Sequence, residues 1–258
     1  MPRDWAVVRD LGRSQFSLGT LRTAQKRYDE AIEEFHRAQK AFESELQANP
    51  ASSAAQHNVA LCHKRIGAIR SVQGSYQESL AAYTFAQKIE EQLAAADPGN
   101  TTAQYDLSIT LTDIGLQWKN LGRPKDALAN YQRALRIRES LAKTDPNDVR
   151  LHRGLASIEA RLGAFLLSMK NYREALTHLE RAQLNSRADD QNSVDLMRFK
   201  AGRESDLGHA LEALGRHAEA AIHFKTSDGM FRSLEKSAPL TEADLKEWSR
   251  VKAALEKK

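Results

Sequence analysis

Proline and glycine recur along this chain at a fixed step, and that regularity constrains the fold more than any other feature. Prolines lie 48 residues apart at Pro2, Pro50, Pro98 and Pro146. Glycines keep the same step at Gly19, Gly67, Gly115 and Gly163. The next glycine in phase, Gly208, follows after 45 residues, and Pro239 lies 31 residues beyond it, as each earlier partner proline does. A fixed step of this kind predicts an array of similar structural units.

The step divides the chain into five expected units, at about residues 2–49, 50–97, 98–145, 146–190 and 191–238. The fourth unit is three residues short. Loops tolerate deletions better than helices do, so we place this deletion in the polar stretch 185–193. The length of the chain therefore favours one elongated array over two globular domains.

The composition indicates that these units are helical. In 258 residues there are only 13 Gly and 6 Pro, and aromatic residues make up 7% of the chain. Helix breakers are scarce, and the β-branched and aromatic residues that favour strands are not enriched. The sequence thus predicts an all-α protein.

Each unit carries the same pattern after its glycine, which predicts two helices joined by a tight turn. The turn lies seven residues after the glycine, at Gly74, Gly122 and Gly215, with Lys26 and Lys170 in the other two units. Then come a small residue (Ala31, Ser79, Ala127, Ala175, Ala220), a bulky one (Phe35, Tyr83, Tyr131, Leu179, Phe224) and a second small one (Ala38, Ala86, Ala134, Ala182, Ser227). Small and bulky side chains at three- and four-residue steps let two helices approach and interlock.

Polar residues in capping patterns predict where several helices begin. Capping boxes are expected at Ser53–Gln56 and Thr101–Gln104, and a third at Thr241–Asp244 opens the segment 240–258. In that last segment one helical stripe holds Leu245, Trp248, Val251 and Leu255. An amphipathic final helix is what caps the end of a repeat array.

Two residues after the turn, three units have a tyrosine, at Tyr28, Tyr76 and Tyr172, and the other two have Pro124 and His217. The recurring Gly, Tyr and Ala–Phe–Ala positions resemble the tetratricopeptide repeat (TPR), and the resemblance covers nearly all of residues 2–239. It implies a right-handed α-α superhelix of five helix-turn-helix repeats, followed by a C-terminal capping helix at 240–258. The units are longer than the usual repeat, and they look like long-helix bacterial arrays found C-terminal to serine/threonine kinase or other signalling domains. The first unit has no such cap, which predicts a longer natural protein or self-association through this end.

The residue patterns contain no catalytic, metal-binding or cofactor-binding constellation. His217 and His223 are six residues apart, which is not the spacing of two ligands on one helix face. The glycines are dispersed and so form no phosphate-binding loop. Cys62 is the single cysteine, which excludes an intramolecular disulfide and fits a cytoplasmic location. We therefore expect no enzyme activity, no cofactor, no metal and no membrane span.

The resemblance implies that a ligand would lie along the first helix of each unit, at the positions six and three residues before the glycine and one and four after it. The position ten before the glycine continues the same stripe. In the fourth and fifth units these positions hold Arg153, Ser157, Ala160, Ala164 and Leu167, and Arg198, Gly202, Ser205, His209 and Glu212. Carried onto this chain, the candidate groove residues are Arg9, Arg13, Phe16, His57, Lys64, Tyr105, Thr112, Lys119, Arg153, Arg198 and His209. Six Lys or Arg among the groove positions face one acid, Glu212, which favours an acidic peptide or a C-terminal carboxylate. Ala68 stands where the carboxylate clamp of chaperone adaptors needs Asn, which argues against a chaperone-tail receptor.

Three functions remain open from the sequence. The leading one is a non-enzymatic scaffold that binds a peptide or a partner helix in a mildly basic groove. The alternative is the regulatory or sensory region of a larger bacterial signalling enzyme such as a kinase. Nucleic-acid binding is disfavoured, because the net charge is only +4 and basic clusters interleaved with aromatic residues are missing.

Overall fold

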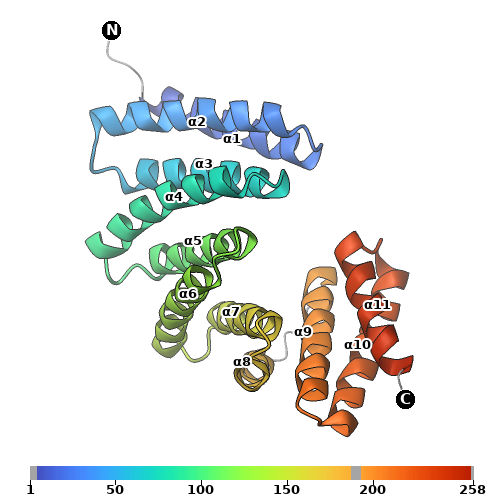
Figure 1. Ribbon diagram of the computed structural model, residues 1–258. Helices are drawn as coiled ribbons and strands as arrows, with labels where there is room; N and C mark the ends of the chain where they lie inside the picture. Colours follow the sequence, from blue (N-terminus) through green and yellow to red (C-terminus); the bar gives the residue numbers. More distant parts are fainter. Residues whose placement is uncertain (1–4, 187–192, 257–258) are drawn as a thin grey trace. The chain divides into compact units, whose positions relative to one another are not determined.

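The computed structural model describes residues 5–186 and 193–256, and all regular secondary structure in those residues is helical (Figure 1). The helices are α1 (Trp5–Ala24), α2 (Tyr28–Ala48), α3 (Ser53–Val72), α4 (Tyr76–Ala96), α5 (Thr101–Asn120), α6 (Pro124–Thr144), α7 (Val149–Ser168), α8 (Tyr172–Asn185), α9 (Val194–Ala213), α10 (His217–Ser237) and α11 (Glu242–Glu256). The chain forms two compact units, Met1–Ile137 and Arg138–Lys258, which divide within α6. The all-α prediction is confirmed.

The helices come in pairs joined by tight turns, as the spacing predicts. The first helices of the pairs end at Ala24, Val72, Asn120, Ser168 and Ala213, so that successive ends are separated by 48, 48, 48 and 45 residues. Figure 1 shows the second helix of each pair folding back along the first. The sequence step is therefore also the step of the helix pairs.

The turns have the left-handed backbone that the glycine positions predict. Gly74, Gly122 and Gly215 have φ values of +77°, +71° and +75°. Lys26 and Lys170 occupy the same turn position with φ values of 59° and 61°. A side chain in this conformation costs about 1–2 kcal/mol relative to glycine, so two of the five turns are strained.

We expect Lys170→Gly to raise the free energy of unfolding by about 1 kcal/mol, because glycine relieves the left-handed backbone strain. The reverse change, Gly122→Lys, is expected to lower it by a similar amount. Urea denaturation followed by circular dichroism measures both. Equal stabilities for Lys170→Gly and the parent protein would contradict this account of the turn.

Each glycine of the 48-residue series marks a close approach between the two helices of a pair. A Cβ atom on Gly67 would lie 3.0 Å from the Tyr83 ring, and one on Gly115 would lie 2.7 Å from the Tyr131 ring. The bulky residues predicted to fill this contact are all buried: Phe35, Tyr83, Tyr131, Leu179 and Phe224. The small residues on either side of them are likewise buried, which confirms the predicted interlocking.

The helix starts are displaced by one residue from the expected capping boxes. The cap of α3 is Ser52, whose Oγ accepts from the Ala55 N–H at 3.2 Å, and not Ser53. The cap of α5 is Asn100, whose Oδ1 accepts from the Ala103 N–H at 3.0 Å, and not Thr101. A side-chain oxygen one residue earlier satisfies the first free N–H groups, so each helix gains a residue at its start.

The glutamines of those expected boxes have a different partner. Gln56 donates from Nε2 to the carbonyl of Pro50 at 3.0 Å, and Gln104 donates to that of Pro98 at 2.6 Å. At the same position one repeat later, Nε2 of His152 lies 3.1 Å from the Pro146 carbonyl oxygen. The prolines of these three loops are therefore tied to the first turn of the next helix.

The fourth pair departs from the others at its second helix. α8 is 14 residues long, whereas α2, α4, α6 and α10 each have 21. The predicted deletion therefore falls between the start of α8 and the start of α9, and residues 187–192 of the expected stretch lie outside the described residues.

The final helix begins with the reciprocal cap that the sequence predicts. The Thr241 N–H donates to Asp244 Oδ2 at 2.8 Å, and the Asp244 N–H donates to Thr241 Oγ1 at 3.1 Å. Trp248 and Val251 are buried against α10 in the core of the second unit. Leu245 was expected on the same stripe but is 51% exposed, so the packed stripe is narrower than the sequence indicates.

Candidate functional site

The candidate groove positions lie on the first helix of each pair. In the second compact unit, Arg138–Lys258, several of them surround one hollow. The hollow has a volume of about 300 Å³ and lies between α7 and α9. Its walls include five positions derived from the repeat register: Ser157, Ala160, Ala164, Arg198 and Gly202. Small side chains at four of these positions leave the space open.

The remaining walls of this α7–α9 hollow carry its charge. Arg161, Arg203 and Asp206 line it together with Phe199. Arg161 is exposed and has no ion-pair or hydrogen-bond partner among the described residues. The hollow therefore combines an available guanidinium, a carboxylate and an aromatic ring, a set suited to a polar peptide with an apolar side chain.

Two of the arginines at the hollow are held by the protein itself. Arg198 donates to Asp244 Oδ2 at 2.9 Å and to the Pro239 carbonyl at 2.9 Å. Arg203 is buried and donates to Ser186 Oγ at 2.6 Å and to Glu204 Oε1 at 3.3 Å. Their charges are largely committed to structural contacts.

Glu204 remains ionised despite its burial, which is what keeps Arg203 in place. Burial raises the pKa of Glu204, but a hydrogen bond from His223 and the charge of Arg203 outweigh that effect, so its pKa lies below the usual value. The His223 Nδ1 lies 2.6 Å from Glu204 Oε2.

Three groove positions of the first compact unit, Met1–Ile137, also lie beside acids. Arg9 makes a two-pronged contact with Glu45, with distances of 3.3 and 3.1 Å. His57 Nδ1 lies 3.7 Å from Asp106, and Lys64 Nζ lies 3.0 Å from Glu90. Burial raises the pKa of Glu90 even though the neighbouring Lys64 lowers it. The side chain of Lys64 is only 13% exposed, so a ligand has little access to it.

These ion pairs make the groove less basic than the sequence count indicates. The groove positions by themselves hold six Lys or Arg residues and one acid. Glu45 and Glu90, which belong to the second helices of their pairs, form ion pairs with two of these cations, Arg9 and Lys64. Arg13, which is exposed, lies 3.8 Å from Asp10, and Lys119 is exposed. The sequence count included positions on the first helices only, so it missed acids that reach the groove from the second helices.

The uncharged candidates are mostly engaged in packing. Phe16 is half-buried with its ring edge against Phe35, with ring centroids 5.2 Å apart. Thr112 is buried and donates to the Ser108 carbonyl at 2.7 Å. The ring of His209 meets that of Phe224 edge-on at 4.9 Å.

Two further candidates differ in their access to solvent. Tyr105 is partly exposed. Arg153 is exposed and lines a small separate hollow beside Asn185 and Ser186.

The described residues offer no metal or redox chemistry of an evident kind. No group of three or more His, Cys, Asp or Glu side chains among them could hold a metal ion. Burial raises the pKa of the Cys62 thiol to about 12, so the thiol is protonated and packed as a small apolar side chain. Within the described ranges, none of the helices has the length and apolar character of a membrane span.

Successive helix pairs with small residues on the first-helix face define a helical-repeat protein. Residues 119–192 match the family model described as tetratricopeptide repeat. This match assigns tetratricopeptide repeats to residues 119–192, and the other described helices continue the same paired arrangement. None of the curated proteins matches the sequence.

Solved structures share the fold at low sequence identity. A Podosopora anserina putative kinesin light chain with nearly identical TPR-like repeats has a TM-score of 0.60 and 14% identity, over 89% of this chain and 97% of that one. BtubC (BKLC) from P. vanneervenii has a TM-score of 0.58 and 15% identity, over 93% and 94%. The Rap conjugation gene regulator of the plasmid pLS20, in complex with the Phr* peptide, has a TM-score of 0.55 and 17% identity. That match covers 86% of this chain and 53% of the regulator.

Proposed function

We propose that this protein is a non-catalytic interaction scaffold that binds a peptide or a partner helix along the first helices of its repeats. The observation that carries the proposal is the hollow between α7 and α9, whose walls include five positions expected from the repeat register. A structurally similar protein, the Rap regulator of pLS20, is seen in complex with a peptide, which supports a ligand of this kind.

The lining of the same hollow indicates which residues would bind an acidic ligand. Arg198 and Arg203 are already paired, so the exposed Arg161 supplies the contact for a ligand carboxylate, and Phe199 supplies an apolar wall. Exposed charge pairs contribute modestly, about 0.2–1 kcal/mol, so shape and apolar contact carry most of the affinity. We infer an acidic preference that is weak rather than dominant.

Two glycines provide a matched test of this site. Neither Gly202 nor Gly229 has an atom within 4 Å of an added Cβ, so a side chain at either position begins in open space. A peptide selected by display on the whole chain is expected to bind about tenfold more weakly to Gly202→Gln, because the new side chain occupies the α7–α9 hollow. Fluorescence anisotropy measures this, with Gly229→Gln on α10 as the control.

The proposal is rejected if the selected peptide binds Gly202→Gln as tightly as the parent protein. A second variant, Arg161→Glu, separates charge from shape. It should weaken peptides that carry an acidic residue and leave neutral ones unaffected.

A second surface bears on self-association. Val7, Leu11, Leu18 and Leu21 form an exposed apolar stripe on α1, with Val7 63% and Leu11 54% exposed. One repeat later the same positions, Ala55, Val59, Ile66 and Ile69, are buried. We propose that a second copy of the chain covers the α1 stripe, since core-type positions left in water favour association.

We expect the parent protein to dimerise and the double variant Leu11→Glu/Leu18→Glu to be monomeric, because two buried carboxylates per copy would oppose the contact. Sedimentation equilibrium distinguishes the two states. The control is Thr20→Glu, at an exposed position on another face of α1, which should leave the dimer intact. A monomeric parent protein at all accessible concentrations would refute the dimer.

A further inference from the structure

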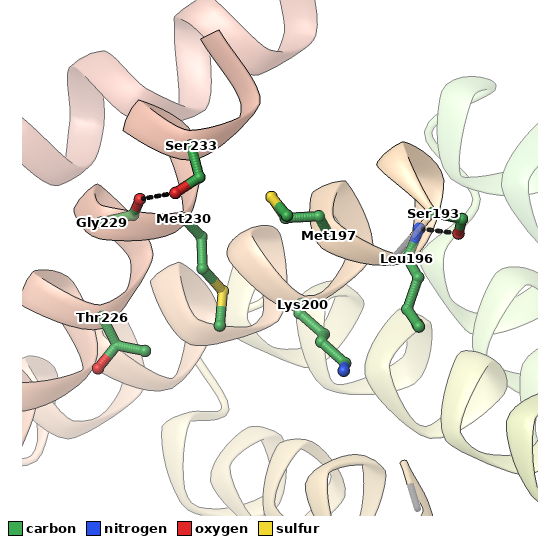
Figure 2. A pocket seen from close by; sticks show the side chains of 8 residues that line it. All are labelled: Ser193, Leu196, Met197, Lys200, Thr226, Gly229, Met230 and Ser233. Atoms are coloured by element: carbon green, nitrogen blue, oxygen red, sulfur yellow. Dashed lines mark hydrogen bonds between the residues drawn. The ribbon is translucent and has the colours of Figure 1, made fainter. Parts of the chain in front are cut away.

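A second hollow, between α9 and α10, lies outside the candidate groove. It has a volume of about 340 Å³ and is lined by Ser193, Leu196, Met197, Lys200, Thr226, Gly229, Met230 and Ser233. Figure 2 shows Met197 from α9 and Met230 from α10 beside this space. We call it the α9–α10 slot.

The repeat register shows what occupies the same place elsewhere. Moving back 141 residues, which is three repeats, takes Lys200 to Val59 and Met230 to Ile89. In that earlier pair, Val59 belongs to a buried cluster with Phe42 from the end of α2. Leu46, one turn further along α2, and Ile89 pack against the same cluster. The last turns of the preceding second helix therefore fill the corresponding space.

In the fourth pair the second helix is shorter, with 14 residues in α8 against 21 in α2. α8 ends at Asn185, and Ser186 stands where α2 has Phe42. Arg203, which replaces Cys62 of the earlier cluster, donates to Ser186 Oγ at 2.6 Å, so a polar contact stands where the earlier pair has an apolar one. Residues 187–192 lie outside the described residues, and their sequence contains one apolar residue, Ala188.

The charge at the slot has one sign. Among the described residues that line it, Lys200 is the sole charged one, and none of them is acidic. Lys200 is half-buried and has no ion-pair or hydrogen-bond partner among the described residues. An occupant that offers a carboxylate beside an apolar face would satisfy it.

We propose that the α9–α10 slot binds a two-turn amphipathic helix from a partner protein, with bulky apolar side chains four residues apart and an acidic side chain directed at Lys200. The occupant thereby takes the place that Phe42 and Leu46 of α2 have in the earlier pair. Met197 and Met230 suit this role because flexible thioether side chains adapt to differently shaped apolar partners. The site is separate from the α7–α9 hollow.

The chain itself supplies the probe. A labelled peptide with the sequence of residues 36–49 carries Phe42 and Leu46 four residues apart, with Glu43 and Glu45 between them. With methionine methyl groups labelled for NMR, we expect this peptide to shift the signals of Met197 and Met230 while Met169 stays unchanged. Substituting serine for both Phe42 and Leu46 in the peptide should abolish the shifts.

Matched variants of the intact protein locate the contact. We expect Gly229→Gln to weaken peptide binding about tenfold by filling the slot, and Lys200→Glu to weaken it about fivefold by repelling the peptide carboxylates. Gly202→Gln, in the other hollow, should bind the peptide as the parent protein does. Thermal unfolding of each variant shows whether it is folded, and the methionine signals of the parent protein test the site without any substitution.

Three results would overturn the proposal: unshifted Met197 and Met230 signals at saturating peptide, equal affinity of Gly229→Gln and the parent protein, or a dimer that Gly229→Gln abolishes. The last result would assign the slot to a second copy of the chain. Because Gly202→Gln reports on the groove and Gly229→Gln on the slot, failure of one site is distinguishable from failure of the other.

Discussion

Replacing Trp248 with alanine is expected to lower the free energy of unfolding of the protein by about 3–5 kcal/mol, the range for removing a large buried aromatic side chain. Trp248 is 6% exposed, and its ring lies nearly parallel to that of Phe231 with centroids 6.1 Å apart. Its Nε1–H donates to Asp228 Oδ1 at 2.7 Å. The substitution thus removes the main anchor of α11 on α10, and urea denaturation measures the loss.

The matched control lies one turn earlier on the same helix. Leu245 is 51% exposed, so Leu245→Ala should change the free energy of unfolding by no more than about 0.5 kcal/mol. The sequence places both residues on one apolar stripe and does not separate them. Similar losses for the two variants would mean that α11 packs through the wider stripe and not as the structure has it.

The second large effect is expected at the glycines of α9, with opposite signs for two positions six residues apart. A Cβ atom on Gly208 would lie 2.5 Å from Phe224 Cε1, and the Phe224 ring is held by the edge of His209. Overpacking of about 3 kcal/mol, offset by about 1 kcal/mol of helix propensity, gives a net loss of about 2 kcal/mol for Gly208→Ala. Gly202→Ala meets open space and should gain about 1 kcal/mol.

Urea denaturation of both variants under identical conditions measures the difference. Since the two substitutions are chemically identical and lie in one helix, a shared sign would show that helix propensity decides the outcome and that the contact with Phe224 is not tight. Opposite signs of the two changes in the free energy of unfolding would support the close contact between Gly208 and the Phe224 ring, and so the equivalent contact in the other pairs.

The two hollows of the second unit use the same helix in different ways. α9 contributes Arg198, Gly202 and Arg203 to the α7–α9 hollow and Met197 and Lys200 to the slot. The first hollow arises because small residues occur at the groove positions, whereas the slot arises because α8 is short. Independent causes make the two sites separable by mutation.

The sequence by itself determined the helical class, the pairing of helices and the positions of the turns. These features depend on local chemistry: glycine at a left-handed turn, a small residue opposite a bulky one, and a polar cap before a helix. Each of these features depends on residues close together in the sequence. Because the features recur at a fixed step, the assignment in one repeat can be checked against the same positions in the others. Even Lys26 and Lys170 have the left-handed backbone that their place in the step predicts.

Only the tertiary structure decided which groove charges a ligand can use and where an apolar surface is left uncovered. Lys64 is neutralised by Glu90 and Arg198 by Asp244, and both acids come from other helices. The slot lies where the earlier pair has a cluster of Phe42 from α2 with Val59 from α3, and Ser186 stands at the position of Phe42. Pairing and coverage depend on which helices lie beside each other, and a residue pattern along one helix does not contain that information.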